Sequence, residues 1–320
     1  MKLTMSQKLQ KRMEQNLSKI VRPMSVVTKE AIAYMAGRRE HNIVSLKTRW
    51  KKFNKQCMGG IEPNTVYTIV GISGSGKSSM ANLIQTDLID CNPNEETIIL
   101  TFSLEMVGFR QVGRTISNKI RKTTSTLYSS ETDLDDDTFR KVINVSNQLK
   151  EYPIYFVDNP MTPMQVNEVI MSFYNEYVKG TNKHFVIIYD HTLLTKPIGS
   201  VLETISELER VFIQVKKLPL TSVIQLGQMN RNIESSERIN NPSNHYPMRS
   251  DISSSDAVFQ ASDYVLVLHR PEILGISEYG PSHLQTSNKV YLHILKNRDA
   301  GKPCIIEFEN ELMYNNLIEC

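Results

Sequence analysis

The chain has 320 residues, of which 40% are hydrophobic, and this composition is typical of a folded protein with a substantial core. No apolar run approaches the roughly 18 residues of a membrane helix, and the N-terminus lacks the apolar stretch of a secretory signal, so we expect a cytoplasmic protein with no membrane association. Its four cysteines are far apart and form no CxxC pair, which disfavours a disulfide framework and a zinc site.

The net charge of +3 conceals an asymmetry along the chain. The first 60 residues contain 14 Lys and Arg against 3 acidic residues, whereas the remainder has a net charge of −8. Residues 4–20 and 25–39 show apolar residues at helical spacing, and Pro23 separates the two stretches. We therefore predict a basic helical arm or linker at residues 1–44, followed by a domain at residues 45–320. A basic arm suits contact with a polyanion or an acidic neighbouring subunit, and the alternative is a solvated helix surface.

A glycine-rich segment reads Gly, four residues, then Gly-Lys-Ser, which is the spacing of a phosphate-binding P-loop. A β-branched stretch at residues 66–70 predicts a buried strand before it, and a helix-forming stretch follows it. Lys77 would reach the β- and γ-phosphates of ATP, while the Ser78 hydroxyl would ligate Mg²⁺. The alternative, an ordinary glycine-rich turn, fits the order of strand, loop and helix less well. The predicted nucleotide-binding residues are Gly71, Ile72, Ser73, Gly74, Ser75, Gly76, Lys77, Ser78 and Ser79.

Two later predicted strands each lead to a carboxylate. The apolar run at residues 185–189 ends in Asp190, and a buried strand that delivers an Asp to the Mg²⁺ shell is the second signature of P-loop NTPases. The strand at residues 97–102 is followed by Glu105, which could polarise a water near the γ-phosphate. On the residue pattern alone, Glu105 also fits the start of a helix.

The remaining predicted elements supply further polar candidates. A strand at residues 222–226 is followed by Gln228, a residue type that can sense the γ-phosphate from a strand end. The stretch at residues 232–255 is rich in Asn, Ser and Pro, which is typical of a functional or disordered loop. Two cations, Lys296 and Arg298, lie in a predicted hairpin tip. The last predicted strands lie at residues 264–268, 290–295 and 304–308.

The order of these segments resembles the C-terminal motor domain of DnaB-type replicative helicases, a RecA-like family. The resemblance covers residues 45–308. It rests on the P-loop together with Phe-Ser-Leu-Glu-Met at 102–106, Ile-Tyr-Asp at 188–190, Gln-Met-Asn-Arg at 228–231 and Lys-Asn-Arg at 296–298. The fold that it implies is an α/β RecA-like P-loop NTPase. Such a fold has a mostly parallel twisted sheet flanked by helices and a C-terminal antiparallel hairpin.

The resemblance also implies roles at matching positions. Glu105 falls on the family's catalytic carboxylate, Asp190 on the Asp associated with Mg²⁺, and Gln228 on the γ-phosphate sensor. Lys296 and Arg298 fall on cations that reach the nucleotide of a neighbouring subunit, so hydrolysis would depend on assembly. The family works as a homohexameric ring around single-stranded DNA. The implied partners are therefore single-stranded DNA and further copies of the chain, together with a primase or helicase loader.

The sequence departs from the family pattern in its DNA-facing loop. The family reads Asp-Leu-Arg-Glu-Ser-Gly, whereas residues 251–256 read Asp-Ile-Ser-Ser-Ser-Asp, without the Arg, the Glu and the Gly. Backbone groups and Ser hydroxyls could still bind phosphate oxygens, with a weaker and less salt-dependent grip. The predicted strand-binding residues are Lys196, Arg231, Arg249, Ser253, Ser254 and Ser255.

We expect an ATP-dependent DNA helicase that resembles short phage-encoded forms without the family's N-terminal domain, and that acts in the host cytoplasm. One alternative is a RecA- or KaiC-like ATPase that binds DNA without unwinding it. Another is a ring-forming scaffold that binds ATP and no longer translocates, which the altered loop at residues 251–256 keeps open. Stimulation of hydrolysis by single strands would exclude the scaffold, and unwinding of a forked duplex would distinguish a helicase from a strand-pairing protein.

Overall fold

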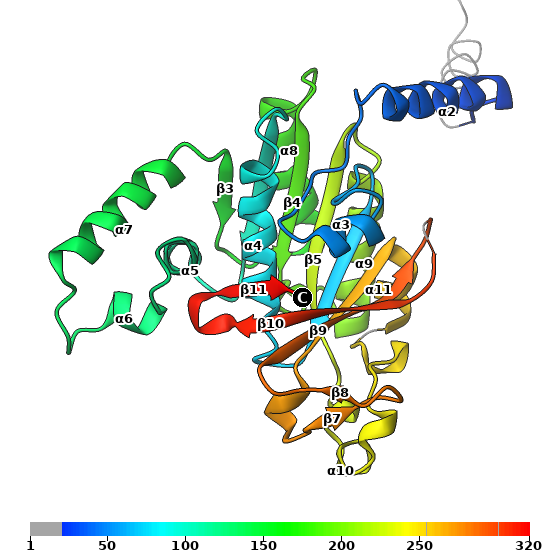
Figure 1. Ribbon diagram of the computed structural model, residues 1–320. Helices are drawn as coiled ribbons and strands as arrows, with labels where there is room; N and C mark the ends of the chain where they lie inside the picture. Colours follow the sequence, from blue (N-terminus) through cyan, green and yellow to red (C-terminus); the bar gives the residue numbers. More distant parts are fainter. Residues whose placement is uncertain (1–20, 254, 300) are drawn as a thin grey trace, which may run out of the picture. The chain divides into compact units, whose positions relative to one another are not determined.

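The computed structural model describes residues 21–253, 255–299 and 301–320 (Figure 1). The chain divides into two compact units, residues 1–44 and residues 45–320. The predicted helix at residues 4–20 lies outside the described residues. The predicted helix at residues 25–39 is confirmed as α2 (Met24–Arg39), which begins directly after Pro23. Among the described residues, no helix combines the length and the apolar character that crossing a bilayer requires.

Within the described part of the second unit, a nine-stranded sheet has the order β11-β10-β9-β6-β1-β5-β4-β2-β3. The strands from β6 to β3 in this order are parallel to their neighbours, whereas β9, β10 and β11 pair antiparallel. This arrangement confirms the predicted α/β fold with its C-terminal antiparallel hairpin. The strands are β1 (Val66–Gly71), β2 (Thr97–Ser103), β3 (Ile154–Val157), β4 (His184–Asp190), β5 (Thr221–Gln228), β6 (Tyr264–His269), β9 (Lys289–Asn297), β10 (Cys304–Glu311) and β11 (Asn316–Glu319).

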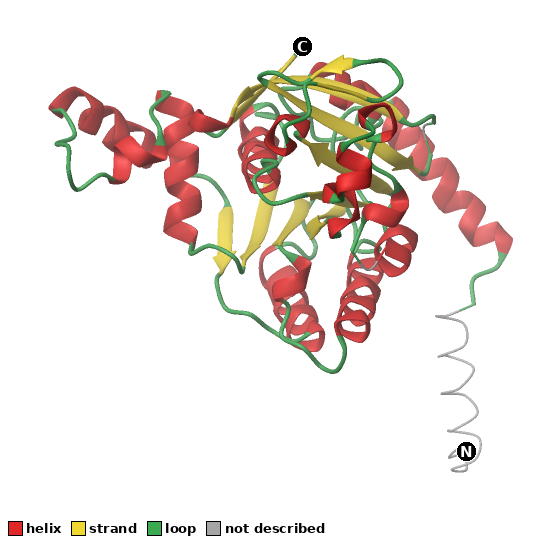
Figure 2. Cartoon of the chain, turned by 90° about the horizontal axis from the view of Figure 1, so that it is seen from below, coloured by secondary structure: helices red, strands yellow, loops and turns green. Residues whose placement is uncertain are grey.

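Helices cover both faces of the sheet (Figure 2). The α-helices of this unit are α3 (Lys51–Gln56), α4 (Lys77–Asp90), α5 (Gly108–Ile120), α6 (Thr124–Tyr128), α7 (Asp136–Leu149), α8 (Pro163–Tyr177), α9 (Val201–Val215), α10 (Ser236–Ile239) and α11 (Ser255–Ala261). The 3₁₀ helices are η1 (Thr192–Leu194), η2 (Arg231–Glu234), η3 (Pro242–Asn244), η4 (Arg249–Asp251), η5 (Pro271–Leu274) and η6 (Leu312–Tyr314). The segment predicted as a loop at residues 232–255 thus consists largely of short helical turns.

The sequence analysis did not predict three short strands. Two of them, β7 (Glu278–Tyr279) and β8 (Leu284–Gln285), form a separate two-stranded sheet. The third is β11, which pairs with β10 at the edge of the main sheet. The two residues of β7 or of β8 are too few to show an alternation of apolar and polar residues.

The central strands are buried on both faces, which explains why their sequences read as continuous apolar runs. On one face, Ile69 of β1 packs in a core that includes Met80 of α4. On the other face, Ile187 of β4 packs with Ile170 of α8 and Phe212 of α9. Neighbouring side chains along one strand therefore enter two different cores, and neither face of the sheet is polar.

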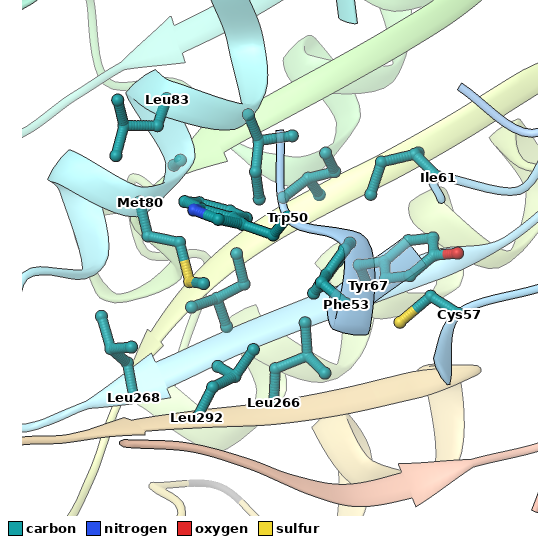
Figure 3. Close-up of a cluster of buried hydrophobic side chains, with 14 of the residues drawn as sticks. Trp50, Phe53, Cys57, Ile61, Tyr67, Met80, Leu83, Leu266, Leu268 and Leu292 are labelled. Carbon is teal, nitrogen blue, oxygen red and sulfur yellow. The ribbon is translucent and has the colours of Figure 1, made fainter. Parts of the chain in front are cut away.

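Trp50 anchors the first of these cores (Figure 3). Its side chain is 1% exposed, and its ring meets the rings of Phe53 and Phe308 edge-on, with centroids 6.0 Å and 5.4 Å away. The indole Nε1 donates a hydrogen bond of 2.9 Å to the backbone carbonyl of Leu317 in β11. The segment before β1 and the last strand of the chain are thereby joined across the core.

A buried carboxyl group lies beneath β5 on the other face. Glu209 of α9 is 2% exposed and accepts a hydrogen bond of 2.8 Å from Nε2 of Gln225, which also donates to Oγ1 of Thr68 at 2.9 Å. Burial raises the pKa of Glu209 from 4.5 to about 8, against the opposing effect of the Gln225 hydrogen bond. The folded protein therefore holds a proton on Glu209 at pH values where the unfolded chain has released it.

We expect Glu209→Gln to raise the melting temperature at pH 8 by on the order of 5 °C and to change it little at pH 5. The raised pKa of Glu209 means that the native state binds more protons than the unfolded state between pH 4.5 and about 8. Stability is therefore lost as the pH rises through this window, and the neutral amide removes that loss. Thermal unfolding followed by Trp50 fluorescence measures the effect.

The control is Glu207→Gln, because Glu207 lies on the same helix and its side chain is 43% exposed. Equal shifts of the melting temperature at pH 5 and pH 8 for Glu209→Gln would contradict the assignment of a neutral buried carboxyl.

Candidate functional site

The P-loop connects β1 to α4 through a turn that requires glycine. Gly74 and Gly76 have φ angles of 75° and 98°, in the left-handed region that favours glycine. Gly76 is the residue that precedes the first turn of α4, so the loop wraps around the helix N-terminus. A Cβ atom on Gly71 would lie 2.5 Å from the backbone carbonyl oxygen of Leu268 in β6. The loop therefore presents backbone N–H groups at a helix N-terminus, which is an anion-binding arrangement.

Lys77 extends back along this loop. Its Nζ donates hydrogen bonds of 2.9 Å to the carbonyl oxygens of Gly71 and Ile72. Burial lowers the pKa of Lys77, whereas the charges of Glu105 and Asp190 act in the opposite direction. The carbonyl oxygens of Gly71 and Ile72 are neutral, and a charged phosphate oxygen is a stronger acceptor for the ammonium group of Lys77. Lys77 can therefore exchange its carbonyl partners for a phosphate within the loop.

Two carboxylates lie at the carboxyl ends of neighbouring strands. Asp190 ends β4 in register with Ser103 of β2 and is 5% exposed. Burial raises the pKa of Asp190 to about 6, against a hydrogen-bonding interaction with the Ser78 hydroxyl. The carboxylate of Glu105 is 56% exposed, and its Oε2 lies 3.9 Å from Nε2 of His191. A divalent cation beside Ser78 and Asp190 would favour the ionised carboxylate, so the donor set fits Mg²⁺.

A cavity of about 460 Å³ unites the P-loop with Glu105. Its volume lies within the usual range for sites that bind small molecules. Among the described residues, no group of three or more His, Cys, Asp and Glu could hold a metal ion. Ser78 and Asp190, together with the phosphates of a nucleotide, would hold Mg²⁺. The lining residues are Ser73, Gly74, Gly76, Lys77, Ser78, Ser79, Glu105, Arg114, Thr124, Arg270, Leu312 and Asn315.

Sequence reasoning missed five of these lining residues. Arg270 directly follows β6, and it could have been found, because the carboxyl ends of parallel strands meet at one edge. Arg114 lies on α5 and Thr124 begins α6, and neither carries a comparable signal. Leu312 and Asn315 come from the turn between β10 and β11, more than 230 residues after the P-loop.

The turn between β10 and β11 lies against the start of α4. The Asn315 Oδ1 accepts a hydrogen bond of 3.4 Å from the Ser79 hydroxyl. A Cβ atom on Gly76 would lie 2.8 Å from Cδ2 of Leu312. The last hairpin of the chain therefore closes one side of the cavity.

Gln228 ends β5 directly beside the P-loop. It pairs in register with Gly71, and its side chain is exposed. Its carbonyl oxygen accepts a hydrogen bond of 3.0 Å from the N–H of Ser253, and Met229 forms a bridge with Ile252. Gln228, the predicted γ-phosphate sensor, is thus connected to the segment with Ser253, which is predicted to bind DNA.

The two cations Lys296 and Arg298 do not reach the cavity of their own chain. Nε of Arg298 lies 3.2 Å from Oδ1 of Asp263, whose backbone N–H donates to the carbonyl of Val66 at the start of β1. The P-loop follows the other end of β1, about 17 Å away for a strand of this length. Lys296 lies within β9 rather than in the hairpin tip where the sequence analysis placed it, and its Nζ donates to the carbonyl of Phe259.

Three of the residues predicted to bind single-stranded DNA lie on the chain that follows β5, namely Arg231, Arg249 and Ser253. Arg231 is exposed at the start of η2. Arg249 forms an ion pair of 2.7 Å with Asp256, and its guanidinium lies 4.6 Å from the ring centroid of Phe259. Its charge is therefore partly neutralised by its own chain.

Lys196 lies on a different connection, between β4 and α9. Lys196 is exposed in the loop after β4, and its backbone N–H donates to the carbonyl of Met161. Ser254 lies outside the described residues, and Ser255 begins α11. Lys196 thus stands on a different connection from Arg231 and Arg249.

Comparison with known families decides how this arrangement is classified. Residues 45–315 match the model of the family described as DnaB-like helicase C terminal domain. The chain belongs to the DnaB-like helicase C-terminal domain family. This membership confirms the resemblance that the sequence motifs indicated.

DnaB-like relatives are distant in sequence. Replicative DNA helicase DnaB of Pasteurella multocida is 22% identical over 254 residues, which are 77% of this chain and 51% of that protein. DnaB of Mycobacterium leprae is 26% identical over 186 residues, which are 57% of this chain and 29% of that protein. The chain therefore matches about half or less of the length of these curated relatives.

Solved structures share the fold. One of them, described as an ATPase domain, superposes with a TM-score of 0.74 and 18% identity, over 91% of this chain and 98% of that domain. A DnaB-like replicative helicase, described with its interactions with primase, has the same TM-score and 17% identity, over 97% of this chain and 74% of that chain. At these identities the likeness establishes the architecture of the sheet and its helices.

We expect Glu105→Gln to retain nucleotide binding and to lower the rate of ATP hydrolysis by about 100-fold or more, because the amide cannot accept a proton from water. Binding of a fluorescent ATP analogue and release of inorganic phosphate measure the two properties separately. The control is Glu151→Gln, since Glu151 is exposed and outside the cavity. Turnover of Glu105→Gln close to that of the unmodified chain would remove Glu105 from this role.

Proposed function

We propose that this chain is the ATP-hydrolysing motor of a DnaB-like replicative DNA helicase, which moves along single-stranded DNA as a ring. The observation that carries the proposal is the position of Arg298 and Lys296 at the sheet edge opposite to their own P-loop cavity. The residues that fall on the family's trans-acting cations lie outside the cavity that contains the P-loop and Glu105, so a neighbouring copy could supply them. Membership of the DnaB-like family supports the same conclusion.

In this proposal the residues of one chain bind and orient ATP. Backbone N–H groups of the P-loop and Nζ of Lys77 hold the phosphates, and Ser78 and Asp190 hold the cation. Mg²⁺, when bound, neutralises charge on the β- and γ-phosphate oxygens. Glu105 orients the attacking water and accepts its proton, while Arg114 and Arg270 add positive charge to the cavity wall.

The neighbouring copy supplies the remaining charge. Arg298 is 47% exposed and pairs with Asp263, so an exposed part of its guanidinium remains accessible to an incoming phosphate. A cation that acts across an interface makes hydrolysis depend on assembly, and it lets each subunit respond to the one beside it. We propose a hexamer, as the family resemblance implies.

Single-stranded DNA is the proposed substrate for movement. Gln228 connects the P-loop edge to the segment with Ser253, so a change at the γ-phosphate has a backbone route to residues predicted to bind phosphates of DNA. We extend the partners to a primase, because one structural neighbour is described through its interactions with primase. A helicase loader is proposed from the family resemblance alone. The cytoplasmic location and the phage origin stay predictions from the sequence.

The decisive test combines two assays on the same preparation. Single-stranded DNA should stimulate ATP hydrolysis, and the protein should unwind a forked duplex in the presence of ATP and Mg²⁺. Stimulation without unwinding would favour a RecA- or KaiC-like ATPase. No stimulation would favour an ATP-binding scaffold, which the Arg249–Asp256 ion pair and the loss of the family's loop arginine support.

We expect Arg298→Ala to lower ATP hydrolysis by at least about 1,000-fold while each subunit still binds nucleotide, because the residue acts on a neighbour's phosphates. Mixing Arg298→Ala subunits with Lys77→Ala subunits should restore part of the activity, since some interfaces would then pair an intact cavity with an intact Arg298. The measurement is phosphate release across a range of mixing ratios. Activity of Arg298→Ala alone near the level of the unmodified chain would contradict action in trans.

A further inference from the structure

Arg270 forms part of the cavity wall. It follows β6, and the carbonyl oxygen of Leu268 in the same strand end faces Gly71 of the P-loop. Its guanidinium lies 3.5 Å from Glu272, and its buried Nε has no hydrogen-bond partner among the described residues. Arg270 is therefore held by the end of β6 behind it and by its ion pair with Glu272.

The residue directly before Arg270 is a fully buried histidine. Nε2 of His269 lies 3.2 Å from Nδ1 of His245, and Nε2 of His245 lies 2.8 Å from the carbonyl oxygen of Ile233. A carbonyl can only accept, so Nε2 of His245 carries the proton and its Nδ1 is the acceptor. His269 must then donate from Nε2. The two rings form a directed chain of hydrogen bonds from His269 to Ile233.

The surroundings keep this pair neutral. Burial lowers the pKa of His269, and His293, His245 and Arg238 act in the same direction. Burial also lowers the pKa of His245, against the hydrogen bond to Ile233 and the charge of Asp251, which raise it, and Arg238 lowers it further. Nδ1 of His269 is buried and has no partner among the described residues, so the ring makes its polar contact through Nε2 alone. The hydrogen bond to His245 thus orients the His269 ring, while His245 is held by this bond and by its bond to Ile233.

His245 belongs to the segment that carries predicted strand-binding residues. This segment is held together by Arg238, whose guanidinium lies 3.1 Å from Asp251 and donates to the carbonyl of Tyr246 at 2.9 Å. Asp251 in turn accepts from the N–H of Met248 at 2.8 Å. Arg249 follows Met248 directly. A short, hydrogen-bonded stretch of chain therefore connects Arg249 to His245.

We propose that His269 and His245 are positioning residues whose hydrogen bond ties Arg270 in the nucleotide cavity to residues 231–253. When DNA binds that segment, the link holds Arg270 in the position that favours hydrolysis. It acts beside the Gln228–Ser253 contact, which joins the same segment to the P-loop edge from β5. The inference rests on the proposed function, because it needs DNA to alter the rate of hydrolysis.

Two amide substitutions of His269 distinguish the effect of losing the hydrogen bond to His245 from the effect of losing the volume of the ring. His269→Gln places an amide nitrogen near the position of Nε2 and keeps the donor, whereas His269→Asn reaches only the position of Nδ1 and loses it. His245→Gln is a second disruptive variant, because it keeps the donor to Ile233 and lacks the Nδ1 acceptor. The measurements are hydrolysis with and without single-stranded oligonucleotide, affinity for a fluorescent ATP analogue, and melting temperature.

We expect His269→Asn and His245→Gln to reduce the stimulation by DNA at least about fivefold, the lower end of usual coupling between sites. Nucleotide affinity and hydrolysis without DNA should stay within about twofold of the unmodified chain, and His269→Gln should keep the stimulation. Full stimulation in both disruptive variants would overturn the link, as would an equal loss in His269→Gln. If the unmodified chain shows no stimulation by DNA, the proposed function itself fails. Loss of the link alone leaves that function standing.

Discussion

Parallel pairing of β1 with β5 and β6 is the constraint on which the rest of the structure depends. Parallel strands bring their carboxyl ends to one edge, so residues that follow different strands meet there although they are far apart in sequence. The edge is crowded, because Gly71 lies against the carbonyl of Leu268 and Gly76 lies against the side chain of Leu312. Glycine at both positions is what allows the loop, β6 and the last hairpin to share one wall of a cavity.

The same sheet holds two sets of charged side chains apart, one at the carboxyl ends of the parallel strands and one at their amino ends. Lys77, Glu105 and Asp190 lie at the carboxyl edge, whereas Arg298 pairs with Asp263 at the opposite one. A parallel strand of six residues keeps these sets about 17 Å apart within one chain. A second copy can bring them together without any change in the fold of either chain. The physical basis of the proposed cooperation between subunits is therefore the length of β1.

Buried polar side chains connect the end of the sheet that carries the cavity to the rest of the domain. Glu209 and Gln225 form a hydrogen-bonded pair beneath β5, and His269 and His245 form another behind the cavity. Burial favours the neutral forms of Glu209 and His269, so each pair supplies a directional hydrogen bond and no net charge. Such groups are costly unless they are hydrogen-bonded, and their geometry is therefore specific. Gln225 and His269 lie on β5 and β6, whose ends lead to Gln228 and Arg270.

The sequence alone determined the features that are local in the chain. The P-loop and Asp190 were recognisable because each lies at the end of a strand, and the α/β order predicted that these strand ends meet. Glu105 was assigned through the family resemblance, because on the residue pattern alone it also fits the start of a helix. Only the tertiary structure decided which distant residues complete the site. Arg114, Leu312 and Asn315 reach the cavity through packing between elements that have no fixed spacing in sequence. Lys296, predicted in a turn, proved to lie inside β9, because pairing with β6 rather than local turn chemistry sets where that strand ends.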